Sequence, residues 1–304
     1  MIIVLEYNLK NLAPIILFTY NRPWHTRQTV AALQNNYLAD RSELIVFSDA
    51  PKNSDAISAV NQVRQYLHTI QGFKSIQIIE QQENYGLAKS IIKGVTQIVN
   101  EYGRIIVLED DLVTSAHFLE FMNLGLTTYE SSSKVASIHG YIYPIKDLPE
   151  TFFIRGADCW GWATWKDRWD IFEPNGERLL EQLLAKDLTK KFDFNNKYPY
   201  TKMLQAKISG RNDSWAIQWY ASAFLNNMLT LYPGESYVKN IGHDSLGTHT
   251  KQETKNFDVD LCQNLNFKEI KIIEDKKARV KIEKYFRNLH HKRFIRKIVS
   301  IFYV

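Results

Sequence analysis

Three adjacent carboxylates, Glu109, Asp110 and Asp111, follow an apolar run from Ile105 to Leu108. Such a run predicts a strand buried on both faces of a parallel sheet, with this acidic triplet at its carboxyl end. Ligands of open α/β sheets bind there, and three repelling charges require a cation or a hydrogen-bonding ligand. Carboxylate oxygens suit Mg²⁺ or Mn²⁺, which keep other positions for water and phosphate oxygens. The triplet therefore predicts a metal and diphosphate site; the alternative is that the acids cap the helix that follows.

A second pair of residues follows the first two predicted strands. Arg22 lies in the turn after the first strand, and Asp49 ends the second. Aspartate accepts a hydrogen bond from a base imide and arginine offers a fork to phosphate, so the pair suits a nucleotide. The competing interpretation is an acid that caps a turn and an arginine on the surface.

Asp213 precedes Trp215 at the start of a predicted helix. A carboxylate there is either a general base that takes a proton from an attacking hydroxyl or the cap of that helix, and spacing does not separate the two. The segment from Cys159 to Trp169 holds four of the seven tryptophans of the chain. That density indicates either a plug in the core or a platform for a flat or sugar-like ligand.

Strands and helices alternate through the first half of the chain, which predicts a right-handed, mainly parallel α/β sheet. Apolar residues at helical spacing mark the helix before the triplet, which Gly103 ends; they are Leu87, Ile91, Val95, Ile98 and Tyr102. We expect strands at 14–20, 43–49, 75–80, 104–109, 134–138 and 229–232. We expect helices from Pro23 and over about 55–70, 86–102, 115–130, 177–190 and 214–227.

Composition limits the class of protein. With 304 residues, 45% hydrophobic content and 23% charge, the chain suits one large domain, or one domain with appendages. Its two cysteines, Cys159 and Cys262, are far apart, which argues against a disulfide scaffold or structural zinc and fits a reducing compartment. Neither a signal peptide nor a membrane span is expected, so we expect a cytoplasmic protein.

The net charge of +5 is concentrated in the last 29 residues, where ten Lys or Arg stand against one acid, Glu283. Apolar residues are interleaved with these charges at roughly helical spacing: Ile282, Phe286, Leu289, Phe294, Ile298 and Phe302. This pattern predicts a basic amphipathic helix on the inner face of an anionic membrane. The alternative is a helix packed on the catalytic domain or used in a dimer. Nucleic acid is not expected, because no stacking surface or binding motif accompanies the charge.

Several of these motifs occur in the order seen in GT-A-fold glycosyltransferases. They are Phe18 to Pro23, Ser48-Asp49, Glu109 to Leu112, Gly161-Trp162 and Asn212 to Trp215. Over about residues 13–250 the chain resembles the inverting N-acetylglucosaminyltransferase I type and the bacterial family-2-like sugar transferases. The resemblance implies a GT-A catalytic domain at 1–250, with a donor half at about 13–115 and an acceptor half at about 116–250. A connector at 251–275 and the basic tail at 276–304 would follow.

The resemblance also implies the roles of single residues in a metal-dependent transfer from a nucleotide sugar. Asp111 would hold Mn²⁺ or Mg²⁺ against the diphosphate, and Glu109 and Asp110 would contact the hydroxyls of donor sugar and ribose. Three further residues would bind the donor: Arg22 and Asp49 the nucleotide, with uracil favoured, and Trp162 beside them. Asp213 would be the base, with Asp158 or Glu235 as the next candidates. The loop from Ile241 to His249 would close over the donor.

We therefore expect an inverting transfer to a glycan or lipid-linked saccharide in surface polysaccharide synthesis. A sugar nucleotidyltransferase would share the sheet and metal, but Tyr20 to Pro23 stand where its Gly-rich phosphate loop is expected. A non-catalytic carbohydrate-binding protein would explain the tryptophans but not three acids at a strand end.

Overall fold

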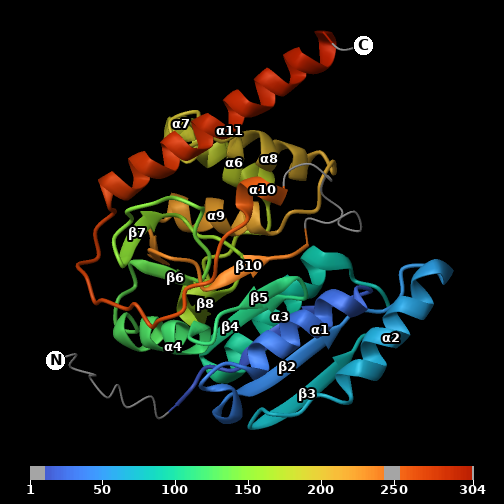
Figure 1. Cartoon of the computed structure of the whole chain (residues 1–304). Coiled ribbons are helices and arrows are strands. Elements are labelled where there is room, and N and C mark those ends of the chain that lie inside the picture. The colour runs from blue at the N-terminus through green and yellow to red at the C-terminus, as the bar shows by residue number, and fades with distance from the viewer. Residues whose placement is uncertain (1–10, 243–253, 303–304) are drawn as a thin grey trace.

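A computed structural model describes residues 11–242 and 254–302, with side chains over 11–242 and 256–289 (Figure 1). The described residues contain an eight-stranded sheet in the order β3-β2-β1-β4-β8-β6-β9-β7. Its strands are β1 (Ile15–Thr19), β2 (Glu43–Ser48), β3 (Ser75–Glu80), β4 (Arg104–Glu109), β6 (Val135–His139), β7 (Thr151–Arg155), β8 (Trp162–Trp165) and β9 (Leu229–Pro233). A second, two-stranded sheet pairs β5 (Leu112–Thr114) with β10 (Val238–Asn240).

The first four strands form the expected parallel half. β1 lies between β2 and β4 and pairs in parallel with both, and β3 pairs in parallel with β2. Residues alternate between the two faces along these strands: Ile15 and Leu17 pack into one cluster, and Ile16 and Phe18 into the other. Both faces are therefore buried at β1, β2 and β4, which explains why these strands are apolar runs, whereas β3 at the edge (SIQIIE) is only partly buried.

Helices cover both faces of this half (Figure 1). Residues of α1 (Pro23–Gln34), α2 (Ile57–Leu67) and α4 (Phe118–Thr128) pack on one face, and residues of α3 (Gly86–Tyr102) and α9 (Ala216–Leu225) on the other. The buried apolar stripe of α3 is shorter than expected, because Leu87 and Tyr102 at its two ends are exposed. Gly103 ends α3 with φ +77°, a left-handed conformation that glycine adopts without strain.

The second half of the sheet is mixed. β8 pairs antiparallel with β4 and β6, and β7 pairs antiparallel with β9. β4 was expected to lie in a parallel sheet. That expectation is confirmed on the side of β1 but is wrong on the side of β8, which is antiparallel. Neither β7 nor β8 was expected, because both are short and β8 begins and ends with tryptophan.

The residues after the acidic triplet also differ from the expectation. Leu112–Thr114 form β5, and α4 begins only at Phe118. The triplet therefore does not cap a helix, and that alternative is wrong. It occupies the junction between β4 and β5 instead.

Smaller helices complete the half of the fold at residues 116–250, which was predicted to bind the acceptor: α5 (Lys166–Trp169), α6 (Gly176–Ala185), α7 (Thr189–Phe192) and α8 (Tyr200–Ile208); α10 (Thr254–Phe257) follows it. An aromatic cluster, with Phe152, Phe192 and Phe224 among its members, joins this half to α11 (Lys276–Phe302). One helix expected at 177–190 is two, α6 and α7, and α8 was missed. Short 3₁₀ turns, Ala39–Arg41 and Ser54–Ala56, precede β2 and α2.

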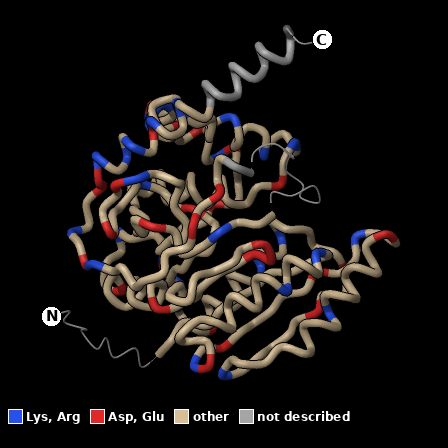
Figure 2. Tube along the Cα trace, in the orientation of Figure 1, with Lys and Arg blue, Asp and Glu red and all other residues tan. Residues whose placement is uncertain are grey.

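The start of α11 is part of the folded body. Asp275 Oδ1 caps it by accepting from the backbone N–H of Lys277 and Ala278 at 2.8 and 2.9 Å. Ile282 and Phe286 are buried in the aromatic cluster, and Lys and Arg recur along the described part of the helix (Figure 2). The expectation that these two apolar residues face a membrane is therefore wrong. No helix among the described residues has the length and apolarity needed to cross a bilayer.

Candidate active site

The predicted functional residues lie where β1, β2 and β4 end. In the parallel register Thr19 lies opposite Ser48, and Phe18 opposite Glu109. The turns that follow these strands therefore share one edge of the sheet. The structure brings Arg22, Asp49 and the acidic triplet to this edge, as the sequence predicted.

Arg22 and Asp111 form an ion pair at the centre of this edge. Arg22 Nη1 lies 2.7 Å from Asp111 Oδ2, and both side chains are less than a fifth exposed. Arg22 Nη2 lies 2.8 Å from His25 Nε2 and donates to the carbonyl oxygen of Gly242 at 3.3 Å. A Cβ on Gly242 would lie 1.9 Å from Asp111 Oδ2, so only glycine allows the backbone to approach this carboxylate so closely.

Glu109 and Asp110 lie beside this pair, where, among the described residues, Arg22 alone offsets the negative charge of the three acids. Burial, followed by repulsion from Asp111 and Asp110, raises the pKa of Glu109 to about 8. Burial and then repulsion from Asp111 likewise raise the pKa of Asp110 to about 7, although Arg22 and the backbone N–H of Tyr20 act against the rise. The Tyr20 N–H donates to Asp110 Oδ2 at 3.3 Å, and the Thr29 hydroxyl donates to the Asp110 carbonyl oxygen at 2.8 Å.

This donor set fits a divalent ion that completes its shell with oxygens of a ligand. No group of three or more His, Cys, Asp or Glu residues in the described part of the chain is arranged to hold a metal ion alone. Mg²⁺ and Mn²⁺ need only one or two protein carboxylates when water and phosphate oxygens supply the rest. Burial and mutual repulsion raise the pKa of Glu109 and Asp110, and a cation bound beside these carboxyl groups would favour their ionised forms.

Asp49 has a different environment from the acidic triplet. Its Oδ1 accepts from the backbone N–H of Ala50 and Tyr85, each at 2.9 Å. Its Oδ2 accepts from Asn84 Nδ2 at 3.0 Å and from the backbone N–H of Gly86 at 2.9 Å. Four donors fill the four lone-pair positions of a carboxylate, so none is left for a base imide. The expected contact of Asp49 with uracil does not fit this geometry; Asp49 anchors the start of α3 to β2.

Asp213 lies above that anchored turn. Its Oδ2 is 3.9 Å from the position that a Cβ on Gly86 would take, and its Oδ1 accepts from Lys207 Nζ at 2.6 Å. Its side chain is 65% exposed. Helix α9 begins only after Trp215 and has no side-chain cap, so the helix-cap interpretation of Asp213 is wrong. Asp213 is open to solvent near the edge of the sheet, as a base would need to be.

Trp162 does not line the site. Its side chain is fully buried and packs against Trp169, Trp215 and Trp219, with ring centroids 5.6 to 5.8 Å away. The structure therefore assigns Trp162, Trp165 and Trp169 to the core, and the expected donor contact of Trp162 is wrong. An alternating strand such as β8 must place residues 162 and 164 on the face opposite 163 and 165, and both faces of this sheet are covered.

Other expected residues lie elsewhere. His249 and the loop segment 243–249 lie outside the described residues, whereas Ile241 and Gly242 at its start lie beside Asp111: the Ile241 N–H donates to the Asp111 carbonyl oxygen at 2.9 Å. Glu235 contacts Cys262 Sγ and Asn266 Nδ2, each at 3.2 Å, in the connector. The sequence placed Gly242 only in the loop expected to close over the donor and did not predict its contacts with Arg22 and Asp111.

Comparisons with known proteins found a family match and similar solved structures. Residues 15–145, less than half of the chain, match the family described as Glycosyl transferase family 2. A search of curated proteins found no match. Similar solved structures include the mannosyltransferase PcManGT from Pyrobaculum calidifontis in complex with GDP-Man and Mn²⁺, at 12% identity and TM-score 0.33, with 44% of this chain and 36% of that chain covered. Residues 1–349 of S. aureus TarS give 12% identity and TM-score 0.41, with 75% and 60% covered.

The chain thus covers less than two thirds of each of these structures. The family match, together with the mixed sheet and its flanking helices, confirms the expected GT-A class of fold. The finer resemblance to N-acetylglucosaminyltransferase I stays a prediction. The residues that match glycosyl transferase family 2, 15–145, include Arg22, Asp49 and the acidic triplet.

Proposed function

We propose that the protein is a metal-dependent, inverting glycosyltransferase that moves a sugar from a nucleotide sugar to a saccharide hydroxyl. The observation that carries this proposal is the Arg22–Asp111 pair beside two carboxyl groups of raised pKa, at the ligand-binding edge of a family 2 domain. A diphosphate supplies the oxygens that such a site lacks, and Arg22 supplies a fork for them.

Each residue then has a defined task. Arg22 neutralises charge that grows on the leaving diphosphate, and His25 and the Gly242 carbonyl hold its guanidinium in place. Asp111 would hold Mn²⁺ or Mg²⁺, which when bound polarises the phosphate oxygens. Asp213 takes the proton of the acceptor hydroxyl as that oxygen attacks the anomeric carbon from the face opposite the diphosphate, so that configuration inverts. Lys207 holds the Asp213 carboxylate at 2.6 Å until the acceptor arrives.

The proposed donor is a UDP sugar, and the proposed acceptor is a glycan or a lipid-linked saccharide of surface polysaccharide. Because Asp49 is saturated by the protein, it fixes the Asn84–Gly86 turn under the nucleotide instead of contacting uracil. The roles of Glu109 and Asp110 toward donor hydroxyls are kept from the resemblance.

A panel of nucleotide sugars, assayed with and without Mn²⁺, tests the proposal by release of nucleoside diphosphate. Metal-dependent release with transfer to a saccharide is expected. Release of pyrophosphate from a nucleoside triphosphate and a sugar phosphate would instead identify a nucleotidyltransferase. Saccharide binding without any release would identify a carbohydrate-binding protein.

We further propose a peripheral location on the inner membrane face through the end of the tail. Ile282 and Phe286 are committed to the core, so the membrane-binding part begins after Leu289, where Lys292, Arg293, Arg296 and Lys297 follow in sequence. A chain shortened after Leu289 keeps the buried residues and is the matched control for the full chain. We expect the full chain to float with anionic vesicles at low salt. The shortened chain should not float, and high salt should prevent flotation of the full chain. Equal flotation of both chains would contradict the proposal.

A further inference from the structure

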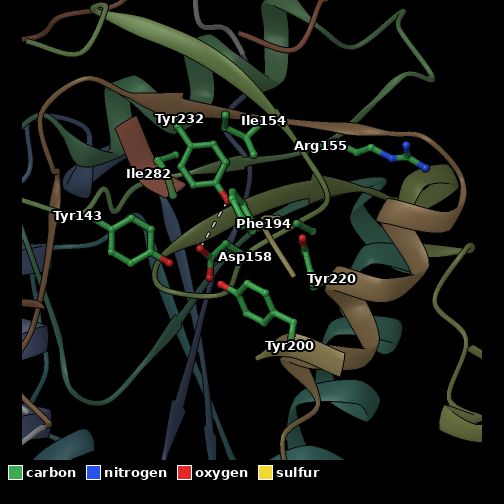
Figure 3. A pocket seen from close by; sticks show the side chains of 10 residues that line it. Tyr143, Ile154, Arg155, Asp158, Phe194, Tyr200, Tyr220, Tyr232 and Ile282 are labelled. Carbon is green, nitrogen blue, oxygen red and sulfur yellow. Dashed lines mark hydrogen bonds between the residues drawn. The ribbon is translucent and has the colours of Figure 1, made fainter. Parts of the chain in front are cut away.

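A pocket ringed by tyrosines lies in the acceptor half (Figure 3). Its centre is Asp158, in the loop between β7 and β8. The hydroxyls of Tyr143, Tyr200 and Tyr232 point toward the Asp158 carboxylate from three separate parts of the chain, and Tyr232 donates to Oδ2 at 3.4 Å. Aliphatic and aromatic side chains form the remaining wall: Ile154, Ala157, Phe194, Tyr220 and Ile282 of α11, beside Arg155.

The loop that carries Asp158 passes close to the acidic triplet. β8 pairs antiparallel with β4, with Trp162 opposite Val107, so the chain just before Trp162 runs beside the carboxyl end of β4. In agreement, burial raises the pKa of the Cys159 thiol and the charges of Asp158, Glu109 and Asp111 raise it further. The pocket therefore adjoins the proposed donor site from the side of the acceptor half.

Among the described residues that line the pocket, no cation compensates Asp158. The guanidinium of Arg155 points away, because its Nε and Nη2 donate to the Phe224 carbonyl oxygen at 2.9 and 2.7 Å. His139 Nε2 lies 3.9 Å from Asp158 Oδ1, but it accepts from the backbone N–H of Trp160, so that nitrogen carries no proton.

The carboxylate has room for a further hydrogen bond. Besides Tyr232, Asp158 accepts from the backbone N–H of Cys159 at 2.9 Å, and its side chain is 27% exposed. The Cys159 thiol also donates to this carboxylate, so three donors leave one of its four positions open. The enclosed space is about 10 Å³, enough for one small polar group but not for a sugar ring. Tyr143 and Tyr200 line the pocket and are half-buried, and a sugar ring can pack against such an aromatic side chain.

We propose that this pocket is the acceptor subsite: Asp158 binds one hydroxyl or ammonium group of a non-acidic acceptor sugar whose ring lies against Tyr143 and Tyr200. The assignment of this sugar as the acceptor rests on the function proposed above. The lone negative charge selects hydrogen-bond donors and repels carboxylate or phosphate groups, so acidic sugars are rejected at this position. Ile282 makes the docked half of α11 part of the subsite wall.

Direct binding tests the subsite without turnover. The probes are the methyl glycosides of glucose, glucosamine and glucuronic acid, titrated by NMR onto the full chain with UDP and Mn²⁺ present. The glucoside or the glucosaminide should bind, and Asp158→Asn should weaken that affinity about tenfold, as for a lost hydrogen bond to a charged group. Which of the two binds more tightly distinguishes a hydroxyl from an ammonium group. The glucuronide should bind the unmodified chain at least tenfold more weakly and gain affinity in Asp158→Asn.

Two further variants keep the test specific. Asp170→Asn removes an equal charge from an exposed position and should leave glycoside affinity unchanged. Tyr232→Phe removes only the hydroxyl that contacts Asp158 and should weaken binding severalfold, which covers the case in which Asp158→Asn does not fold. Unchanged affinity in both Asp158→Asn and Tyr232→Phe, an equal loss in Asp170→Asn, or glucuronide binding as tight as glucoside binding overturns the subsite. Glycoside binding that depends on Asp158 in a protein that transfers no sugar supports the subsite while refuting the proposed function.

Discussion

Two strands on either side of β1 end in acids, and the protein treats these acids in opposite ways. At the end of β2, the carboxylate of Asp49 accepts four hydrogen bonds from its own chain. At the end of β4, Asp110 is buried and Glu109 is partly buried beside Asp111, and of the three only Asp111 forms an ion pair with an arginine in the described part of the chain. The hydrogen-bonding positions of Asp49 are therefore filled by the protein itself, whereas the charges of the acidic triplet are balanced only when a ligand binds.

The difference separates a structural carboxylate from a binding site. Buried charges are stable when the protein supplies their hydrogen bonds, as it does for Asp49. Where the protein supplies too few hydrogen-bond donors, the carboxyl groups bind protons or a cation, as at the acidic triplet. Counting donors around each carboxylate therefore assigns roles that the residue type alone does not. Asp158, with three donors and a partly exposed side chain, belongs with the second class.

The largest effect is expected from Asp111→Asn. The change removes a charged ligand and leaves Arg22 without its partner, so Mn²⁺-dependent donor binding should be lost and transfer should fall by about 10³-fold or more. Calorimetric titration of UDP with and without Mn²⁺ measures the binding. Asp167→Asn, at an exposed site, is the control. Metal-dependent UDP binding that persists in Asp111→Asn would show that the carboxylates at the end of β4 do not need Asp111 to bind a metal.

Asp213→Asn should give the next largest effect. Turnover should fall by about 10²-fold, the usual size for a lost general base, while the affinity for donor persists. Steady-state kinetics with varied donor, together with donor titration, separates the two quantities. Asp49 holds the turn next to Asp213. This variant therefore also tests whether the residues at the end of β2 contribute to catalysis only by positioning Asp213. A fall in donor affinity with turnover intact would remove Asp213 as the base.

Sequence alone predicted the elements whose pattern is local. β1, β2 and β4 contain buried apolar runs, and the acids at the ends of β2 and β4 were found because parallel strands share an edge. What it missed depends on distant partners. The four donors of Asp49 come from residues 50 and 84–86, and the tyrosines around Asp158 from residues 143, 200 and 232. Trp162 was misassigned because tryptophans in a sugar site and in a core look alike in sequence.

Asp49→Asn should act mainly on stability. The amide nitrogen cannot accept from the N–H groups of Tyr85 and Gly86, so at least one buried donor is left unpaired, at a cost of about 1–3 kcal/mol in the free energy of unfolding. Urea unfolding measures this loss. In the folded variant the donor affinity should change less than tenfold. A variant of unaltered stability that fails to bind UDP would reverse the assignment and make Asp49 a ligand contact.

The smallest effect is a dependence of stability on pH that a divalent ion removes. Glu109 and Asp110 have raised pKa values in the folded chain, about 8 and about 7, so the folded state holds protons that the unfolded state releases above about pH 4.5. Stability contributed by these protons is present in full below the unfolded pKa and is lost as pH rises through the folded pKa. Without metal, the Tm should therefore fall between pH 5 and pH 8.5 by on the order of 5 °C.

Mn²⁺ favours the ionised carboxylates, so it should raise the Tm more at pH 8.5 than at pH 5. Glu109→Gln, which cannot ionise, should flatten the metal-free curve, whereas Asp49→Asn should shift the whole curve downward without changing its slope over this range. Thermal unfolding at five pH values, each with and without Mn²⁺, measures all of these. An equal response to Mn²⁺ at pH 5 and pH 8.5, or a slope that Asp49→Asn flattens as much as Glu109→Gln does, would erase the distinction between the two strand ends.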